Sequence, residues 1–175
     1  MSGHHIEVMF SEEVVDRRIQ ELGDRITEDY KGKQVHLVCV LKGGAFFMCE
    51  LAKRIKLDVS LDFMSVSSYG SGTESSGLIK IIKDLDEPLK DKEVIVVEDI
   101  VDSGRTLSYL LKMLGDRGPK SLKLCTLLDK PDRRVTDVDV TYTGFTIPDE
   151  FVVGYGLDYD QKYRNLPYIG IVKFD

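Results

Sequence analysis

The chain has no tryptophan, three histidines and three cysteines, and these low counts limit its chemistry. Two histidines are adjacent near the N-terminus and His36 lies within an apolar run, so a Ser-His-Asp or Cys-His catalytic arrangement has little to draw on. Cys39, Cys49 and Cys125 form no CxxC pair, and the first and last fall within predicted strands. We therefore expect reduced core thiols, and we expect neither a disulfide framework nor a zinc site. Any catalysis should depend on carboxylates, lysine and a metal ion.

Long apolar runs and an excess of positive charge are also missing. The 175 residues carry a formal net charge of -6, which opposes non-specific binding to nucleic acids or anionic membranes. No apolar run is long enough to span a bilayer, and the N-terminus lacks the pattern of a signal peptide. We expect a single cytoplasmic domain over residues 1–175 that binds neither nucleic acid nor membrane.

The most informative stretch predicts a strand, a tight turn and a helix. Val94 to Val97 are consecutive apolar, β-branched residues, as in a strand buried on both faces of a parallel sheet. Asp102 to Thr106 form a small, hydroxyl-rich turn, and leucines from Leu107 to Leu114 then recur with helical spacing. The unpaired N–H groups and the dipole at the start of such a helix attract phosphate.

Two acidic residues, Glu98 and Asp99, lie between this strand and the turn. They would repel a bare phosphate unless the ligand also brings hydroxyl groups that donate to carboxylates, or a Mg²⁺ ion that bridges them. A sugar phosphate with a free diol and bound Mg²⁺ meets both requirements. The alternative is a strand-turn-helix with a purely structural role. The chain contains neither the GxxxxGK[ST] nor the GxGxxG phosphate-binding motif.

Two further segments suggest ligand contacts. A strand over 35–41 leads into Lys42-Gly43-Gly44, where glycines permit close backbone approach and Lys42 suits a second anionic group, although a bare turn is equally compatible. Residues 67–77 are mostly Ser, Gly and Thr between apolar segments, which predicts a mobile loop that is either a lid or a simple hairpin tip.

The rest of the pattern predicts an α/β fold. Helices are expected from Ser11 to about Gly32 and over 46–55, with strands over 61–66, 78–82, 122–128 and 168–174. Helices that alternate with apolar strands predict a twisted parallel sheet covered by helices on both faces. Lys130 follows a strand, at the edge where open α/β sheets bind ligands.

Two motifs carry a family resemblance: VVEDIVDSGRT at 96–106 and IPDEFVVGYGLDY at 147–159. Over nearly its whole length the chain resembles the hypoxanthine(-guanine) phosphoribosyltransferases of the type I phosphoribosyltransferase family. The resemblance implies that family's fold, with a small hood built from the terminal segments and a mobile lid hairpin. It also implies Mg²⁺-dependent transfer of the 5-phosphoribosyl group of phosphoribosyl pyrophosphate (PRPP) to N9 of hypoxanthine, and of guanine. The products would be IMP or GMP and pyrophosphate, and relatives are homodimers or homotetramers.

The resemblance further implies residue roles. The PRPP-binding residues would be Glu98, Asp99, Asp102, Ser103, Gly104, Arg105 and Thr106. Asp102 would act as general base, Lys42, Gly43 and Arg164 would bind pyrophosphate, and Ser68 and Tyr69 would belong to the lid. Lys130, Phe151, Val152 and Asp158 would bind the purine, and Glu98, Asp99 and Asp158 would hold Mg²⁺. Members of the family often have a non-proline cis peptide at the position of Leu41-Lys42, and the sequence leaves its presence in this chain open.

A rival function remains, namely a non-catalytic regulator on the same fold that senses PRPP or nucleotides. The acidic charge and the complete set of motif residues favour the enzyme. The preference among hypoxanthine, guanine and xanthine is open.

Overall fold

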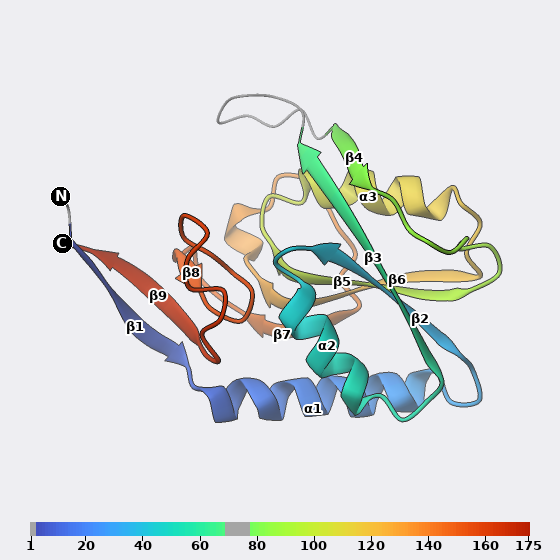
Figure 1. The fold of residues 1–175 in the computed structure, drawn as a ribbon, viewed down its shortest axis with the longest axis horizontal. Helices are drawn as coiled ribbons and strands as arrows, with labels where there is room; N and C mark the ends of the chain where they lie inside the picture. The colour runs from blue at the N-terminus through green and yellow to red at the C-terminus, as the bar shows by residue number, and fades with distance from the viewer. Residues whose placement is uncertain (1–2, 69–77) are drawn as a thin grey trace.

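The computed structural model describes residues 3–68 and 78–175. Its main sheet has six strands in the order β4-β3-β2-β5-β6-β7 (Figure 1). The strands are β2 (Val35–Leu41), β3 (Val59–Ser68), β4 (Ile79–Lys83), β5 (Glu93–Val101), β6 (Ser121–Asp129) and β7 (Tyr142–Thr146). All neighbouring pairs are parallel except β3 and β4, which pair antiparallel. The predicted parallel sheet is confirmed, with an antiparallel strand added at one edge.

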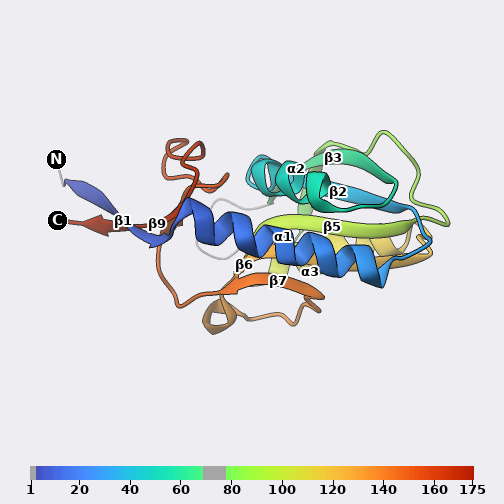
Figure 2. The same ribbon diagram turned by 90° about the horizontal axis from the view of Figure 1, so that it is seen from below.

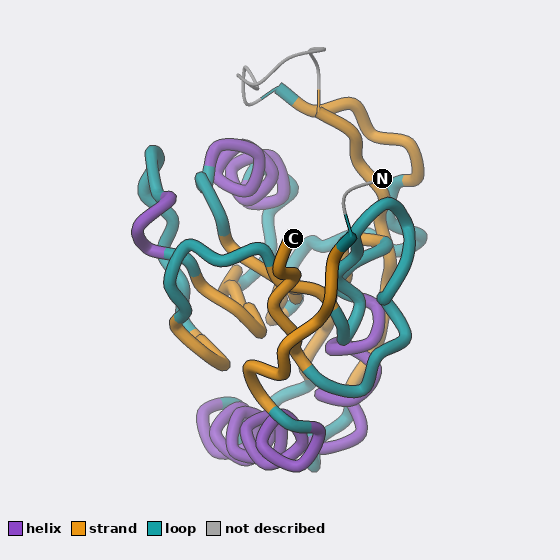
Figure 3. The backbone as a smooth tube through the Cα atoms, turned by 90° about the vertical axis from the view of Figure 1, so that its left-hand side faces the viewer, coloured by secondary structure: helices purple, strands orange, loops and turns teal. Residues whose placement is uncertain are grey.

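Helices cover both faces of this sheet (Figure 3). The helices α1 (Glu12–Asp29) and α2 (Ala45–Arg54) pack on one face, and α3 (Arg105–Gly115) packs on the other. A short 3-10 helix, η1 (Pro131–Arg133), follows β6. As predicted, Ser11 caps α1, with its hydroxyl accepting the N–H of Val14 at 3.3 Å.

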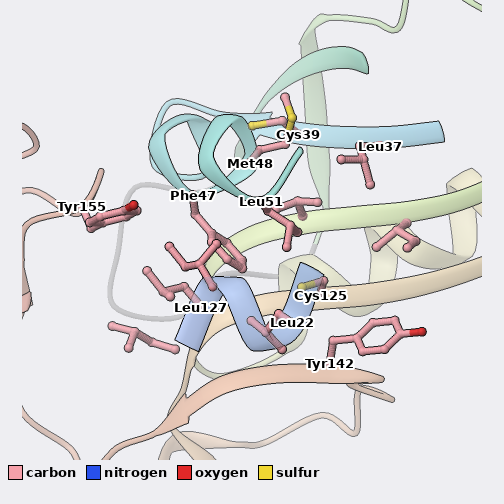
Figure 4. Packing of buried hydrophobic residues seen from close by; sticks show 14 of the residues in the cluster. Leu22, Leu37, Cys39, Phe47, Met48, Leu51, Cys125, Leu127, Tyr142 and Tyr155 are labelled. Atoms are coloured by element: carbon pink, nitrogen blue, oxygen red, sulfur yellow. The ribbon is translucent and has the colours of Figure 1, made fainter. Parts of the chain in front are cut away.

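The larger core lies between the sheet and α1 and α2. Its buried side chains include Leu22 from α1, Phe47 and Leu51 from α2, and Leu127 from β6 (Figure 4). Cys39 in β2 and Cys125 in β6 are buried free thiols, as expected. The second core joins α3 to the other face through Val96, Leu107 and Leu110 among others. Both faces of β2 and of the first part of β5 are therefore buried, which explains why these segments are apolar apart from His36 and Glu93.

A second, smaller sheet forms the predicted hood. It contains β1 (His4–Phe10), β9 (Ile169–Phe174) and β8 (Val152–Val153) in the order β1-β9-β8, all antiparallel. Figure 2 shows the β1–β9 ribbon projecting beyond the main sheet, with both ends of the described chain at its far end. The predicted lid falls largely on residues 69–77, outside the described part of the chain. None of the described helices is long and apolar enough to cross a membrane.

Candidate active site

The acid pair lies near the end of β5, and both side chains are partly buried. Burial raises the pKa of Glu98 well above its ordinary value, and the negative charge of Asp99 and a hydrogen bond with it raise this pKa further. Burial also raises the pKa of Asp99, although its carboxylate accepts the N–H of Ile100 at 2.8 Å. The pair therefore tends to retain a proton until a cation or a hydroxyl donor compensates its charge.

This pair fits the chemistry of Mg²⁺, which is commonly held by one or two carboxylates together with substrate phosphates and waters. Within the described ranges, no three acidic, histidine or cysteine side chains gather where they could hold one metal ion. The remaining ligands of an ion at Glu98 and Asp99 would thus come from substrate and water. Asp158 is not grouped with these two acids, and its predicted role as a ligand concerns a separate ion.

The predicted phosphate turn begins α3 as expected. Gly104 precedes the helix with φ of 83°, a left-handed conformation that favours glycine, and any side chain there would overlap the carbonyl of Thr136. The carbonyl of Ser103 accepts the N–H groups of Val135 and Thr136 at 2.9 and 3.1 Å, which fixes the turn. The N–H of Arg105 donates to the Ser103 hydroxyl at 3.4 Å.

A cavity of about 210 Å³ opens at this turn. Its lining includes five residues predicted to bind PRPP, namely Glu98, Asp102, Ser103, Gly104 and Thr106. At the end of β3, the Ser68 hydroxyl lies 3.5 Å from that of Thr106. The structure thus brings the first of the two predicted lid residues to the phosphate turn, while Tyr69 lies outside the described residues.

The loop after β2 packs directly against the acid pair. The Leu41-Lys42 peptide is cis, a point that the sequence left open. A side-chain carbon at Gly43 would overlap the Asp99 carboxylate, and one at Gly156 would overlap the carbonyl of Gly43. Two close glycine contacts therefore join the loop, the end of β5 and the C-terminal segment.

Three predicted residues meet at one that the motifs did not indicate, Gln161. Its side-chain oxygen accepts from Arg164 at 3.2 Å and from Lys42 at 3.5 Å. Its N–H donates to Asp158 at 2.8 Å, and that carboxylate lies 3.3 Å from the Arg164 guanidinium. Arg164 also donates to the carbonyl of Gly156 at 2.6 Å, whereas its buried Nε lacks a hydrogen-bond partner in the described chain. Gln161 thus aligns the two cations predicted to bind pyrophosphate.

A chain of charged groups links Lys130 to Asp102. Lys130 is buried, and its Nζ lies 3.8 Å from an oxygen of Asp149, whose other oxygen lies 3.8 Å from the Arg133 guanidinium. The Nε of Arg133 donates to the Asp102 carboxylate at 3.2 Å. Sequence reasoning missed Arg133 and Asp149. Their only signals are positions three residues after Lys130 and within the IPD motif.

Phe151 and Val152 lie in or next to the hood. Phe151 is 47% exposed and contacts the Tyr159 ring edge-to-face with centroids 5.6 Å apart. Val152 is buried, and its backbone belongs to β8. Phe151 is therefore not a core residue, and it leaves an aromatic surface available to a planar ligand.

Comparisons with known proteins identify the family of the chain. The model of the phosphoribosyl transferase domain matches residues 11–160. The chain is 54% identical over 171 residues to a hypoxanthine phosphoribosyltransferase of Salmonella typhimurium, which covers 97% of this chain and 96% of that protein. It is 52% identical over 166 residues to a hypoxanthine-guanine phosphoribosyltransferase of Streptococcus thermophilus, which covers 95% of this chain and 92% of that protein.

A crystal structure of a Staphylococcus aureus hypoxanthine phosphoribosyltransferase superposes with a TM-score of 0.93 at 51% identity, covering 95% of this chain and 91% of that one. Sequence and fold therefore agree over nearly the whole length. The chain belongs to the phosphoribosyltransferase family, within the group of the hypoxanthine and hypoxanthine-guanine phosphoribosyltransferases.

Proposed function

We propose that the protein acts in purine salvage by transferring the 5-phosphoribosyl group of PRPP to N9 of hypoxanthine, and of guanine, in a Mg²⁺-dependent reaction. The N9–C1′ bond forms as the bond from C1′ to pyrophosphate breaks, and the purine loses a proton. The observation that carries this proposal is the acid pair beside the phosphate turn, in and around a single cavity at the end of β5. A sugar phosphate supplies both the anion for the turn and the hydroxyl groups for the acids.

The turn from Asp102 to Thr106 would bind the 5′-phosphate. Backbone N–H groups at the start of α3 and the hydroxyls of Ser103 and Thr106 are the available donors. Glu98 and Asp99 would accept hydrogen bonds from the ribose diol and hold Mg²⁺, and Asp158 would hold a second ion. When bound, Mg²⁺ neutralises the negative charge that develops on the leaving pyrophosphate.

Lys42 and Arg164 would bind this leaving group directly. Both side chains contact the Gln161 oxygen, so they converge on one place next to Gly43 and Asp99. Preorganised cations at the position where negative charge develops stabilise the transition state more than the ground state, and they therefore lower the barrier.

Asp102 would accept the proton from N7 of the purine. Its carboxylate is exposed beside the cavity and accepts a hydrogen bond from Nε of Arg133 at 3.2 Å. Arg133 keeps this carboxylate in a defined position before the purine arrives, and the purine must compete with it for one oxygen.

The purine would be selected by Lys130, Phe151, Val152 and Asp158. The ammonium group of Lys130 can only donate, so it matches O6 of an oxopurine and opposes the amino group of adenine. The exposed face of Phe151 would stack on the ring, and the Val152 backbone and Asp158 would contact its edge.

Pyrophosphate release from PRPP and Mg²⁺ with each purine in turn tests the proposal. We expect release with hypoxanthine and guanine and negligible release with adenine. Absence of release with every purine would overturn the function. Nucleotide-dependent binding to DNA without pyrophosphate release would instead support the regulator.

We also propose that residues 1–175 form one domain that assembles as a homodimer or homotetramer in the cytoplasm. Support for one domain comes from the larger core, which contains Val152 and Ile169 of the hood together with Leu37 and Phe47 of the main fold. Light scattering on the purified protein measures the assembly, and a monomeric mass at assay concentrations would contradict it.

A further inference from the structure

A second cavity lies at the other end of the parallel strands. It encloses about 700 Å³ and is lined by residues at or just before the starts of β2, β3, β5 and β6, including Lys33, His36, Ser60, Lys92, Glu93 and Lys120. None of the residues assigned above to the active site lines it. From His36 to the end of β2 the strand runs roughly 16 Å at about 3.3 Å per residue, so the two cavities are well separated.

His36 is a lining residue with a buried ring nitrogen that lacks a hydrogen-bond partner in the described part of the chain. Its side chain is 2% exposed, and its Nδ1 lies 2.6 Å from the Ser60 hydroxyl. Its buried Nε2 has no hydrogen-bond partner within residues 3–68 and 78–175. Buried polar atoms are nearly always paired, so an unpaired one indicates a missing partner. If the Ser60 hydroxyl donates to Nδ1, the proton of the neutral ring is on Nε2, which then becomes a donor.

Lysine side chains surround this position. Lys33 and Lys120 lie 3.4 and 3.9 Å from the same oxygen of Glu93, so two ammonium groups share one carboxylate. Lys92 forms no ion pair in the described part of the chain, yet it is close enough to act on His36 electrostatically. Burial lowers the pKa of His36 and the charge of Lys92 lowers it further, against the opposite effect of Asp62 and Glu87. The His36 ring is therefore neutral at neutral pH, while Lys33 and Lys120 share one carboxylate and Lys92 has no ion-pair partner in the described part of the chain.

The lining also holds acidic side chains. Glu87 and Asp91 are exposed there, so the lining as a whole holds three lysines and three acids. A simple anion would satisfy the lysines and leave these carboxylates without donors. A phosphate ester that also carries hydroxyl or amino groups satisfies both sides, because such groups donate to carboxylates.

We propose that this cavity is a second ligand site, separate from the active site, for a small phosphate monoester bearing hydroxyl or amino groups. Its phosphate would accept from Nε2 of His36 and from Lys92, with Lys33 and Lys120 at the rim. Its hydroxyl or amino groups would donate to Glu87 and Asp91.

The histidines give a site-specific readout. The chain has only three histidines, so selective ¹⁵N labelling of histidine yields a simple spectrum. Spectra of the His4→Asn and His5→Asn variants identify the signals of those two residues, and the remaining signals belong to His36. The probe is glucosamine 6-phosphate, which has a phosphate, hydroxyls and an amino group, and glucosamine is its unphosphorylated control. We expect the free protein to carry the ring proton on Nε2, and we expect a saturable shift of this resonance with the phosphate ester only.

Two substitutions test the assignment of charge. Lys92→Gln should weaken the response of His36 about tenfold, the effect of losing one charge-assisted contact. The matched control is Lys90→Gln, an exposed neighbour outside the lining, which should leave the affinity unchanged. An Arg164→Gln variant should also leave it unchanged, since Arg164 belongs to the active site and does not line the second cavity.

Several results would overturn the proposal. They are a His36 resonance that does not respond at millimolar probe, an equal response to glucosamine, and an undiminished response in Lys92→Gln. A response lost in Arg164→Gln would show that the signal arises at the active site. An Nε2 without a proton would remove the donor on which phosphate recognition depends.

Discussion

Replacement of Gly43 by alanine tests whether the position of the acid pair matters for catalysis. Gly43 lies outside every helix and strand, and its φ is not positive, so alanine introduces no backbone strain there. The added carbon would instead stand 2.7 Å from the carboxyl carbon of Asp99 and closer still to one of its oxygens. The perturbation is therefore steric and acts on one predicted catalytic group.

The size of the effect follows from the distances. Ordinary contacts of such a carbon are 3.4 to 4 Å, so the Asp99 carboxyl must move by on the order of 1 Å to accept the methyl group. Misplacement of a reacting or ligating group by about 1 Å costs about 10²-fold in rate. We therefore expect kcat/KM to fall about 100-fold, which corresponds to about 2.7 kcal/mol of transition-state stabilisation.

The assay is pyrophosphate release with hypoxanthine at saturating Mg²⁺, accompanied by thermal unfolding of each variant. Gly115→Ala is the matched control, because its added carbon at the end of α3 would meet only Leu122, at 3.8 Å. It should leave activity unchanged and shift the free energy of unfolding by no more than about 1 kcal/mol.

One outcome would refute the reasoning. Suppose that Gly43→Ala folds normally and retains the parental kcat/KM. Displacement of the Asp99 carboxylate would then be harmless, so Asp99 would hold neither the ribose hydroxyls nor a metal ion. A fall in activity that merely follows a lower melting temperature would have the same consequence, because the acid pair would then not be its cause.

Three further predictions concern base catalysis, base selection and acid stability. Asp102→Asn should lower kcat by about 10² to 10⁴, the contribution of a positioned general base, and pyrophosphate release at the parental rate would contradict that role. The kcat/KM for adenine should be at least about 10⁴-fold lower than that for hypoxanthine, because the buried ammonium of Lys130 would face an amino group. Comparable kcat/KM values would show that Lys130 does not recognise the substituent at position 6 of the purine. Burial alone would raise the pKa of Asp62, but the N–H groups of Glu87, Asp86 and Phe63 donate to its carboxylate and hold this pKa below the ordinary 3.8. The ionised carboxylate therefore stabilises the fold above about pH 4. This stabilisation is lost as the pH falls through the lower pKa of the folded state. Asp62→Asn should therefore cost about 2 to 4 kcal/mol in denaturant unfolding at pH 7 and clearly less at pH 3, whereas an equal cost at both values would exclude this cause.

The main sheet could be predicted because its strands are encoded locally. Burial on both faces requires mostly apolar residues. β2 shows them apart from His36, and β5 shows four in a row after Glu93. β1 could not be found in this way, since its residues alternate between exposed and partly buried and it becomes a strand by pairing with β9. β7 was missed for a similar reason, because five residues with a central glycine carry a weak strand signal.

The candidate site likewise has parts that a local sequence motif encodes and parts that only long-range contacts bring together. The predicted phosphate turn is contiguous in sequence, so its composition alone was enough to suggest an anion site, which stays a prediction. The contacts of Gln161 with Lys42 and of Arg133 with Asp102 join residues that are 119 and 31 positions apart, and no local pattern encodes such pairs. Their residue types are also ordinary for exposed loops. Gln161 reaches the site through the C-terminal segment, and Arg133 reaches it through the 3-10 helix that follows β6.

The glycines show most directly what a sequence leaves undetermined. Gly32 and Gly118 have positive φ and nothing within 4 Å of an added carbon, so they serve the backbone of their turns. Gly43 has no such φ, and it is needed because the Asp99 carboxylate occupies the space of a side chain. Gly156 combines a φ of 97° with close contact to the Gly43 carbonyl. All four look alike in the sequence, yet only the last two bring the acid pair, the loop after β2 and the C-terminal segment into close contact. The assembly of this site therefore depends on tertiary packing that no single motif contains.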